Sequence, residues 1–180
     1  MMNDDIQEIL ISEKEIQTRI AELGKQLEED YAGKEPIFVG VLRGVVVFFS
    51  DMIRASNLPC KIDLLSVSSY GSGTVSSGHV TMSKDVSLNI KGKDVIILED
   101  IIDSGNTLSY VKDHLLSMEP ASLKICAFLD KPSRRQVPIT AEYVGFTIPD
   151  KFVVGYGLDY DDRYRNLPFI GVLKPEVYEK

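Results

Sequence analysis

The residues best suited to chemistry lie within nine positions near the middle of the chain. Glu99 and Asp100 end an apolar run, Asp103 follows, and positions 104–107 read Ser-Gly-Asn-Thr. Adjacent carboxylates suit the two hydroxyls of a ribose, or a hydrated Mg²⁺ shared with them. Asp103 stands between that pair and the next four residues, where it is placed to face a reacting carbon atom.

The four residues after Asp103 have the composition of a phosphate-binding loop. Gly105 lets the backbone approach an anion closely, and Ser104 and Thr107 supply hydroxyls on either side of Asn106. A helix that starts here would direct its first amides and the positive end of its dipole at a phosphate. The alternative is a plain turn in which Thr107 caps the helix. Three carboxylates within five residues favour the ligand site.

Two other phosphate motifs are missing from the sequence. No G-x-x-x-x-G-K-[ST] pattern occurs, which excludes a P-loop nucleotide hydrolase. Gly71-Ser72-Gly73 lacks the third glycine and the following helix of a dinucleotide fingerprint. A Rossmann cofactor site is therefore unsupported.

Apolar strands that alternate with helical segments supply the scaffold for this loop. We predict buried strands at 37–42, 60–67, 94–98 and 122–129, and helices at 45–56 and 107–118. Such alternation indicates an α/β fold with a parallel twisted sheet flanked by helices. Ligands of such sheets bind beyond the carboxyl ends of the strands, where the strand before Asp103 ends.

The ends of the chain are expected to add a smaller unit to this core. Ser12 to Glu15 forms a capping-box pattern, and apolar residues then recur at helical spacing. We expect one domain over residues 1–180, with a core of about 37–142 and a hood of about 1–12 and 143–180. The Ser- and Gly-rich stretch 69–80 is predicted to be a mobile lid.

Composition narrows the class of partner. The net charge of −7 argues against charge-driven binding of nucleic acid, and no apolar run is long enough to span a membrane. The N-terminus has no secretory h-region, and we expect Cys60 and Cys126 to be reduced, as in a cytoplasmic protein. His79 and His114 lack the spacing of a zinc site.

Several segments together resemble the type I phosphoribosyltransferases. Residues 98–107 are similar to the family's signature for 5-phosphoribosyl-1-diphosphate (PRPP), and residues 41–44 to its pyrophosphate loop. Residues 69–71 resemble the start of its catalytic loop, and residues 144–160 its purine-binding hood. The resemblance runs from about residue 37 to 171, and the hood segment points to the hypoxanthine-guanine branch.

The resemblance implies a set of residues around PRPP and Mg²⁺. Glu99 and Asp100 would hold ribose and metal, and Asp159 would reach the metal through water. The residues implied for pyrophosphate are Leu42, Arg43, Gly44, Ser69, Tyr70 and Arg165. The Leu42–Arg43 bond matches a cis peptide of the family, and whether the Arg43 side chain meets pyrophosphate or a neighbouring subunit stays open. Asp161, Asp162, Arg163, Arg134 and Arg135 are expected to be surface charge.

The resemblance also implies a pocket for a 6-oxopurine. Lys131 would donate to O6, Phe152 would stack on the base, and Val153 would contribute backbone contacts. Asp159 is the fourth residue implied for the purine site. Asp103 would accept the proton from N7 of the purine as N9 attacks. The implied activity is purine salvage: transfer of 5-phosphoribosyl from PRPP to hypoxanthine or guanine, giving IMP or GMP. A homodimer or homotetramer is implied.

Three alternatives are compatible with parts of the sequence. One is an RNA-binding regulator on the same fold, similar to the pyrimidine attenuation proteins. The hood segment argues against it, and no basic stripe with interleaved aromatics occurs. Another is a phosphoribosyltransferase for xanthine, adenine or orotate, and Lys131 favours a 6-oxopurine over the last two. The third is a structural domain without activity, which retention of the full residue set disfavours.

Overall fold

The computed structural model describes residues 2–69 and 80–179. Tyr70 and nearly all of the expected lid lie outside the described residues. Ser69 is described by its backbone alone, at the end of a strand.

A six-stranded sheet forms the centre of the molecule. Its order is β4-β3-β2-β5-β6-β7, and every pair is parallel except β3 with β4. The strands are β2 (Ile37–Leu42), β3 (Lys61–Ser69), β4 (Val80–Lys84), β5 (Asp94–Ile102), β6 (Ser122–Asp130) and β7 (Tyr143–Thr147). The expected parallel sheet flanked by helices is confirmed.

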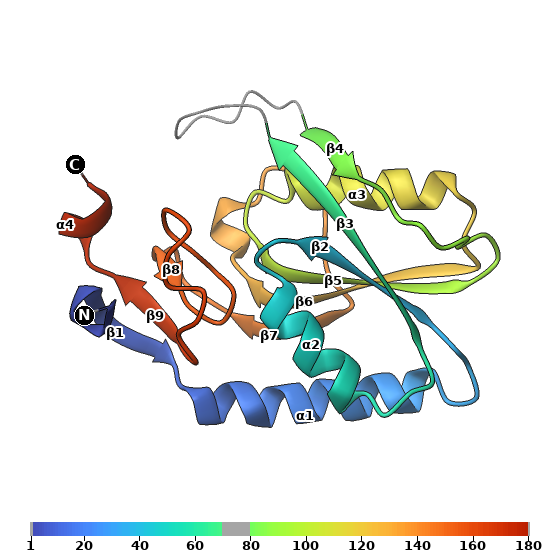
Figure 1. Ribbon diagram of the computed structural model, residues 1–180, viewed down its shortest axis with the longest axis horizontal. Helices are drawn as coiled ribbons and strands as arrows, with labels where there is room; N and C mark the ends of the chain where they lie inside the picture. The colour runs from blue at the N-terminus through green and yellow to red at the C-terminus, as the bar shows by residue number, and fades with distance from the viewer. Residues whose placement is uncertain (1, 70–79, 180) are drawn as a thin grey trace.

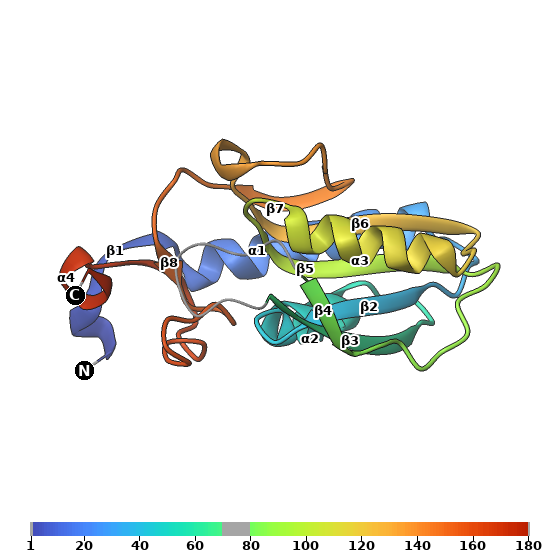
Figure 2. The same ribbon diagram turned by 90° about the horizontal axis from the view of Figure 1, so that it is seen from above.

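Helices cover both faces of this sheet because successive residues of its strands point to opposite sides. On β5, Ile96 and Leu98 pack with the helices α1 (Glu13–Asp30) and α2 (Val46–Ala55). Val95 and Ile97 pack on the other face with α3 (Asn106–Ser117). Figures 1 and 2 show α1 and α2 on one side of the sheet and α3 on the other. Strands buried on both faces explain the unbroken apolar runs in the sequence.

The two ends of the chain meet in a second, three-stranded antiparallel sheet. Its order is β1-β9-β8, with β1 at Ile6–Ile11, β9 at Ile170–Leu173 and β8 at Val153–Val154. A 3-10 turn at Met2–Asp5 precedes it, and the short helix α4 (Pro175–Tyr178) follows. Both termini lie beside this sheet at one end of the molecule (Figure 1).

Local signals in the sequence were accurate where neighbours alone decide structure. The capping box is confirmed, since Ser12 Oγ accepts from the Glu15 N–H and Glu15 accepts from the Ser12 N–H. The expected end of β5 at residue 98 is wrong, because β5 continues to Ile102 and pairs there with Asp130 of β6. Glu99 and Asp100 interrupt the apolar pattern of the sequence, but the backbone pairing of β5 with β6 continues past them. At residue 143, β7 pairs with β6 in the large sheet and not with the hood strands.

No helix within residues 2–69 and 80–179 combines the length and hydropathy needed to cross a bilayer.

Candidate active site

Two cavities open side by side beyond the carboxyl ends of β2, β5 and β6. The smaller has a volume of about 250 Å³ and the larger about 640 Å³. Ile101 and Asp103 line both, so the two cavities share one wall. Asp103 therefore lies where groups held in the two cavities would meet.

The smaller cavity brings together the predicted phosphate loop and the end of β2. Its lining includes Leu42, Arg43, Gly44, Glu99, Asp100, Asp103, Ser104, Gly105 and Thr107. Gly105 has a φ of +84° and precedes the first residue of α3, so the start of the helix adjoins the cavity. This arrangement supplies amides, hydroxyls and the positive end of a helix dipole to an anion.

Close packing explains the glycine of the β2 loop. A Cβ on Gly44 would lie 1.7 Å from Asp100 Oδ2, so no larger residue fits beside that carboxylate. The Leu42–Arg43 peptide bond is cis, as the resemblance implied.

Glu99 and Asp100, near the end of β5, lie where a negative charge is disfavoured. Glu99 is only 7% exposed, and its burial, followed by the neighbouring Asp100 carboxylate, raises its pKa well above the usual value. Burial likewise raises the pKa of Asp100, against the hydrogen bonds it accepts and the charge of Arg165. A cation or ribose hydroxyls beside this pair would relieve both effects.

The donor set fits a divalent cation that also binds substrate oxygens. Within the described part of the chain, no group of three or more Asp, Glu, His or Cys side chains forms a complete metal site. Mg²⁺ commonly takes one or two carboxylates from a protein and completes its shell with water and phosphate oxygens. Glu99 and Asp100 supply such a partial set.

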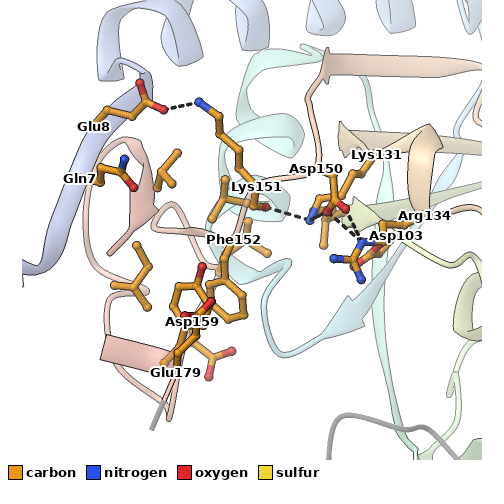
Figure 3. A pocket seen from close by; sticks show the side chains of 16 residues that line it. Gln7, Glu8, Asp103, Lys131, Arg134, Asp150, Lys151, Phe152, Asp159 and Glu179 are labelled. Atoms are coloured by element: carbon orange, nitrogen blue, oxygen red, sulfur yellow. Dashed lines mark hydrogen bonds and ion pairs between the residues drawn. The ribbon is translucent and has the colours of Figure 1, made fainter. Parts of the chain in front are cut away.

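The larger cavity collects the residues expected around a purine. Lys131, Phe152, Val153 and Asp159 all line it (Figure 3). Lys131 is 7% exposed, and its Nζ donates to the Lys151 carbonyl oxygen at 3.0 Å. An ammonium has three N–H donors, so this bond fixes the side chain and leaves donors for a ligand.

Phe152 belongs to an aromatic cluster that the sequence did not indicate. The residue is 40% exposed, and its ring stacks on Tyr178 of α4, with centroids 4.6 Å apart and planes at 16°. Tyr160 meets the Phe152 ring edge-on at 5.7 Å. The cluster fixes the plane of the exposed ring, as a stacking platform for a base requires.

Arg165 and Asp159 form an ion pair beside the two cavities. Arg165 Nη2 lies 2.8 Å from Asp159 Oδ1, and Nη1 donates to the Gly157 carbonyl oxygen at 2.8 Å. Asp159 Oδ2 also accepts from the Asp162 N–H at 2.9 Å. Arg165 lines neither of the two cavities, but its charge acts on Asp100.

The segment after β6 holds the phosphate loop in place, and no local pattern in the sequence indicates this. Arg135 donates to the Asp103 carbonyl oxygen at 3.1 Å, and the Gln136 N–H donates to the Ser104 carbonyl oxygen at 2.9 Å. Arg135 also pairs with Asp130, and its side chain is only 16% exposed. The expectation of surface charge is therefore wrong for Arg135, because three acceptors hold its guanidinium inside the fold.

The Asn106 side chain is bonded within the protein. Its side chain donates to Gln136 Oε1 at 2.8 Å, and it does not line the smaller cavity. The side chain therefore braces the loop, and any contact with phosphate falls to the backbone N–H, which now donates to Ser104 Oγ at 3.3 Å.

The sequence matches the phosphoribosyl transferase domain model over residues 7–161. The chain belongs to this family. The family resemblance of the PRPP signature is thus confirmed, together with the fold that it implied.

Whole-chain relatives fall in the purine branch of the phosphoribosyl transferases. A Streptococcus thermophilus hypoxanthine-guanine phosphoribosyltransferase is 51% identical over 180 residues, covering 100% of both chains. A Staphylococcus aureus hypoxanthine phosphoribosyltransferase structure superposes with a TM-score of 0.96 at 50% identity, covering 99% of this chain and 97% of that one. The bifunctional protein TilS/HprT of Listeria innocua is 52% identical over 179 residues; they are 99% of this chain and 28% of that protein. These comparisons support a phosphoribosyltransferase of purine salvage.

Proposed function

We propose that this protein transfers the 5-phosphoribosyl group of PRPP to N9 of hypoxanthine or guanine, releasing pyrophosphate. The observation that carries the proposal is the pair of joined cavities with Asp103 on their common wall. The phosphate loop and the carboxylate pair would hold PRPP in one cavity. Lys131 and Phe152 would hold the base in the other, so that N9 faces C1 of the ribose.

Asp103 is the proposed general base. Attack by N9 leaves a proton to be removed from the purine ring, and a carboxylate within reach of N7 would accept it. Arg135 donates to the backbone carbonyl oxygen of Asp103, and this bond would help to hold the carboxylate where the base and the ribose would meet. Exclusion of water would protect the electron-poor ribose from hydrolysis.

Lys131 is the proposed reader of the purine. Its ammonium can only donate, so it favours the 6-oxo group of hypoxanthine or guanine over the 6-amino group of adenine. The bond to Lys151 holds the ammonium at the wall of the cavity. Val153 would supply backbone contacts at the base edge. The same contacts would admit xanthine, which is the second candidate substrate.

Mg²⁺ would be held by Glu99 and Asp100 with Asp159 acting through water, and when bound it offsets negative charge on the pyrophosphate. Arg165, Arg43, Gly44 and the backbone at Leu42 would contact the leaving pyrophosphate. Ser69 and Tyr70 keep their proposed role there on the family resemblance alone.

The oligomer and the cellular location are further parts of the proposal. A homodimer or homotetramer follows from the family resemblance. A cytoplasmic location agrees with Cys60 and Cys126, which are both free, and burial raises the pKa of Cys126 to about 12. A thiol with a raised pKa stays protonated and therefore resists oxidation to a disulfide.

The direct test incubates the protein with PRPP, Mg²⁺ and one base at a time: hypoxanthine, guanine, xanthine, adenine or uracil. We expect IMP and GMP from the first two and no product from adenine or uracil. Failure to form nucleotide from any base would refute the enzyme. Binding of a structured RNA with strong salt dependence would support the regulator instead.

A further inference from the structure

Asp162 joins Arg43, which lines the smaller cavity, to Arg165, whose charge acts on Asp100 of the same cavity. Its Oδ1 lies 2.8 Å from Arg43 Nη2 and 3.2 Å from Arg165 Nη2. One carboxylate oxygen therefore contacts guanidinium groups from two loops. Arg43 lies 119 residues before Asp162 in the chain, whereas Arg165 lies three residues after it. The Asp162 side chain is 63% exposed, as expected of surface charge, and it also makes these two contacts.

The same two loops also touch through their backbones. A Cβ on Gly157 would lie 2.0 Å from the Gly44 carbonyl oxygen. The loop after β2, which holds Arg43 and Gly44 (the β2 loop), is therefore in direct contact with the loop between β8 and β9, which holds Gly157 (the hood loop). Arg165 donates to the Gly157 carbonyl oxygen, and the Asp162 N–H donates to Asp159. Asp162 therefore adds a side-chain link to loops that already pack together.

Electrostatics gives this link a specific effect. Two guanidinium groups that converge on one spot repel each other. Arg165 is held by Asp159 and by the Gly157 carbonyl oxygen, whereas the exposed Arg43 side chain has enough freedom to move away. The Asp162 carboxylate offsets that repulsion and holds Arg43 near Arg165. Arg43 is 69% exposed as a side chain, and among residues 2–69 and 80–179 its guanidinium is hydrogen-bonded to the Asp162 carboxylate alone.

We propose that Asp162 is a positioning residue for pyrophosphate recognition. By holding Arg43 and Arg165 together it presets a pair of cations for the diphosphate of PRPP and for the released pyrophosphate. This inference rests on the proposed function, which assigns both arginines to pyrophosphate. Asp162 itself touches neither the base nor the ribose in this scheme.

The residue before Asp162 in the chain provides a matched control. Asp161 is exposed, shares the left-handed backbone conformation of Asp162 (φ +52° against +56°), and forms no hydrogen bond or ion pair with the described residues. Asparagine adopts that conformation readily, so Asp162→Asn and Asp161→Asn remove the same charge with little strain. Asp162→Glu restores the charge on a longer side chain.

The experiment compares these three variants with the wild-type chain. Steady-state kinetics gives kcat and the KM for PRPP and for hypoxanthine, and calorimetry with Mg²⁺ gives the Kd for pyrophosphate. For Asp162→Asn we expect both the PRPP KM and the pyrophosphate Kd to rise roughly three- to tenfold, the range for losing one or two exposed charge contacts. The hypoxanthine KM and the melting temperature should stay unchanged. Asp161→Asn should match the wild type, and Asp162→Glu should recover most of the loss.

Two results would overturn the inference. An unchanged or lower pyrophosphate Kd in Asp162→Asn would mean that the carboxylate does not assist the anion or competes with it. An equal rise in Asp161→Asn would reduce the effect to net charge. Calorimetry keeps the test separate from the proposed function: wild-type protein that binds pyrophosphate but forms no nucleotide refutes the function and still decides the role of Asp162.

Discussion

Arg135 donates from Nε to the carbonyl oxygen of Asp103 at 3.1 Å, across 32 positions of sequence. The residue proposed for catalysis is thus fixed by a guanidinium from the next strand–loop unit of the sheet. The same guanidinium also bonds to Asp130 and to the Ile139 carbonyl oxygen. A planar group with five donors suits these three acceptors in a way that a lysine ammonium does not.

Arg135→Lys should therefore lower kcat without preventing folding. The charge beside Asp130 remains, but the fork to the two carbonyl oxygens is lost and Asp103 gains freedom. We expect kcat to fall roughly 10- to 100-fold, as for small displacements of a reacting group. Turnover is measured beside Arg54→Lys, a change at an exposed side chain on α2. Equal kcat values for the wild type and Arg135→Lys would contradict the positioning role.

Asp103→Asn should remove the proposed proton acceptor while keeping the shape of the loop. We expect kcat to fall by roughly 10²- to 10⁴-fold, the usual range for a general base. PRPP binding should change little, since the loop amides and hydroxyls remain. Single-turnover rates and PRPP titration separate the two effects. Near-normal turnover would exclude Asp103 from the chemistry.

Lys131→Ala should weaken purine binding selectively. Lys131 lines the larger cavity and does not line the smaller one, which contains the phosphate loop. The KM for hypoxanthine and guanine should therefore rise more than the KM for PRPP. Loss of a charged hydrogen bond corresponds to roughly 10-fold or more. Purine KM values equal to those of the wild type would argue against a contact with O6.

Gly44→Ala should disable PRPP binding through a steric conflict. The added methyl group would meet Asp100 Oδ2 at 1.7 Å, so the loop or the carboxylate must move. We expect the PRPP KM to rise at least about tenfold, with a smaller effect on stability. The contrast is Gly33→Ala at a surface turn, where no heavy atom lies within 4 Å of the added carbon; its φ of +76° should lower stability while leaving the PRPP KM unchanged. A Gly44→Ala enzyme with unchanged PRPP KM would be inconsistent with this packing.

Asp63 should make stability depend on pH in the acid range. Burial disfavours its charge, but hydrogen bonds from the N–H groups of Leu88, Leu64 and Ser87 outweigh burial and lower its pKa. A lowered folded pKa gives stability that is present above the ordinary Asp value and lost as pH falls through the folded value.

Asp63→Asn should therefore lower the melting temperature by roughly 3–6 °C at pH 7, from the weakening of charged hydrogen bonds. The gap to the wild type should begin to narrow as pH falls below the ordinary Asp value of about 4, and it should close only below the lowered folded pKa, where the wild-type carboxyl is itself protonated. Melting curves recorded from pH 7 to pH 3 measure the gap. A gap that is constant over this range would show that the charge of Asp63 is not the cause.

By itself the sequence determined the types and order of the main elements and the position of the phosphate loop. Strand alternation, the capping box and the loop after β5 depend on neighbours a few residues apart, which the sequence displays directly. The family resemblance added Lys131 and Phe152, which the structure places in one cavity.

Only the tertiary structure decided which distant side chains hold these groups in place. Arg135 reaches Asp103 because β5 and β6 are adjacent parallel strands whose ends lie together. Arg43 reaches Asp162 because the hood loop folds over the end of β2. Such pairs depend on strand order and loop path, so a charged residue that is supported from a remote segment has the same local signature as one exposed to water.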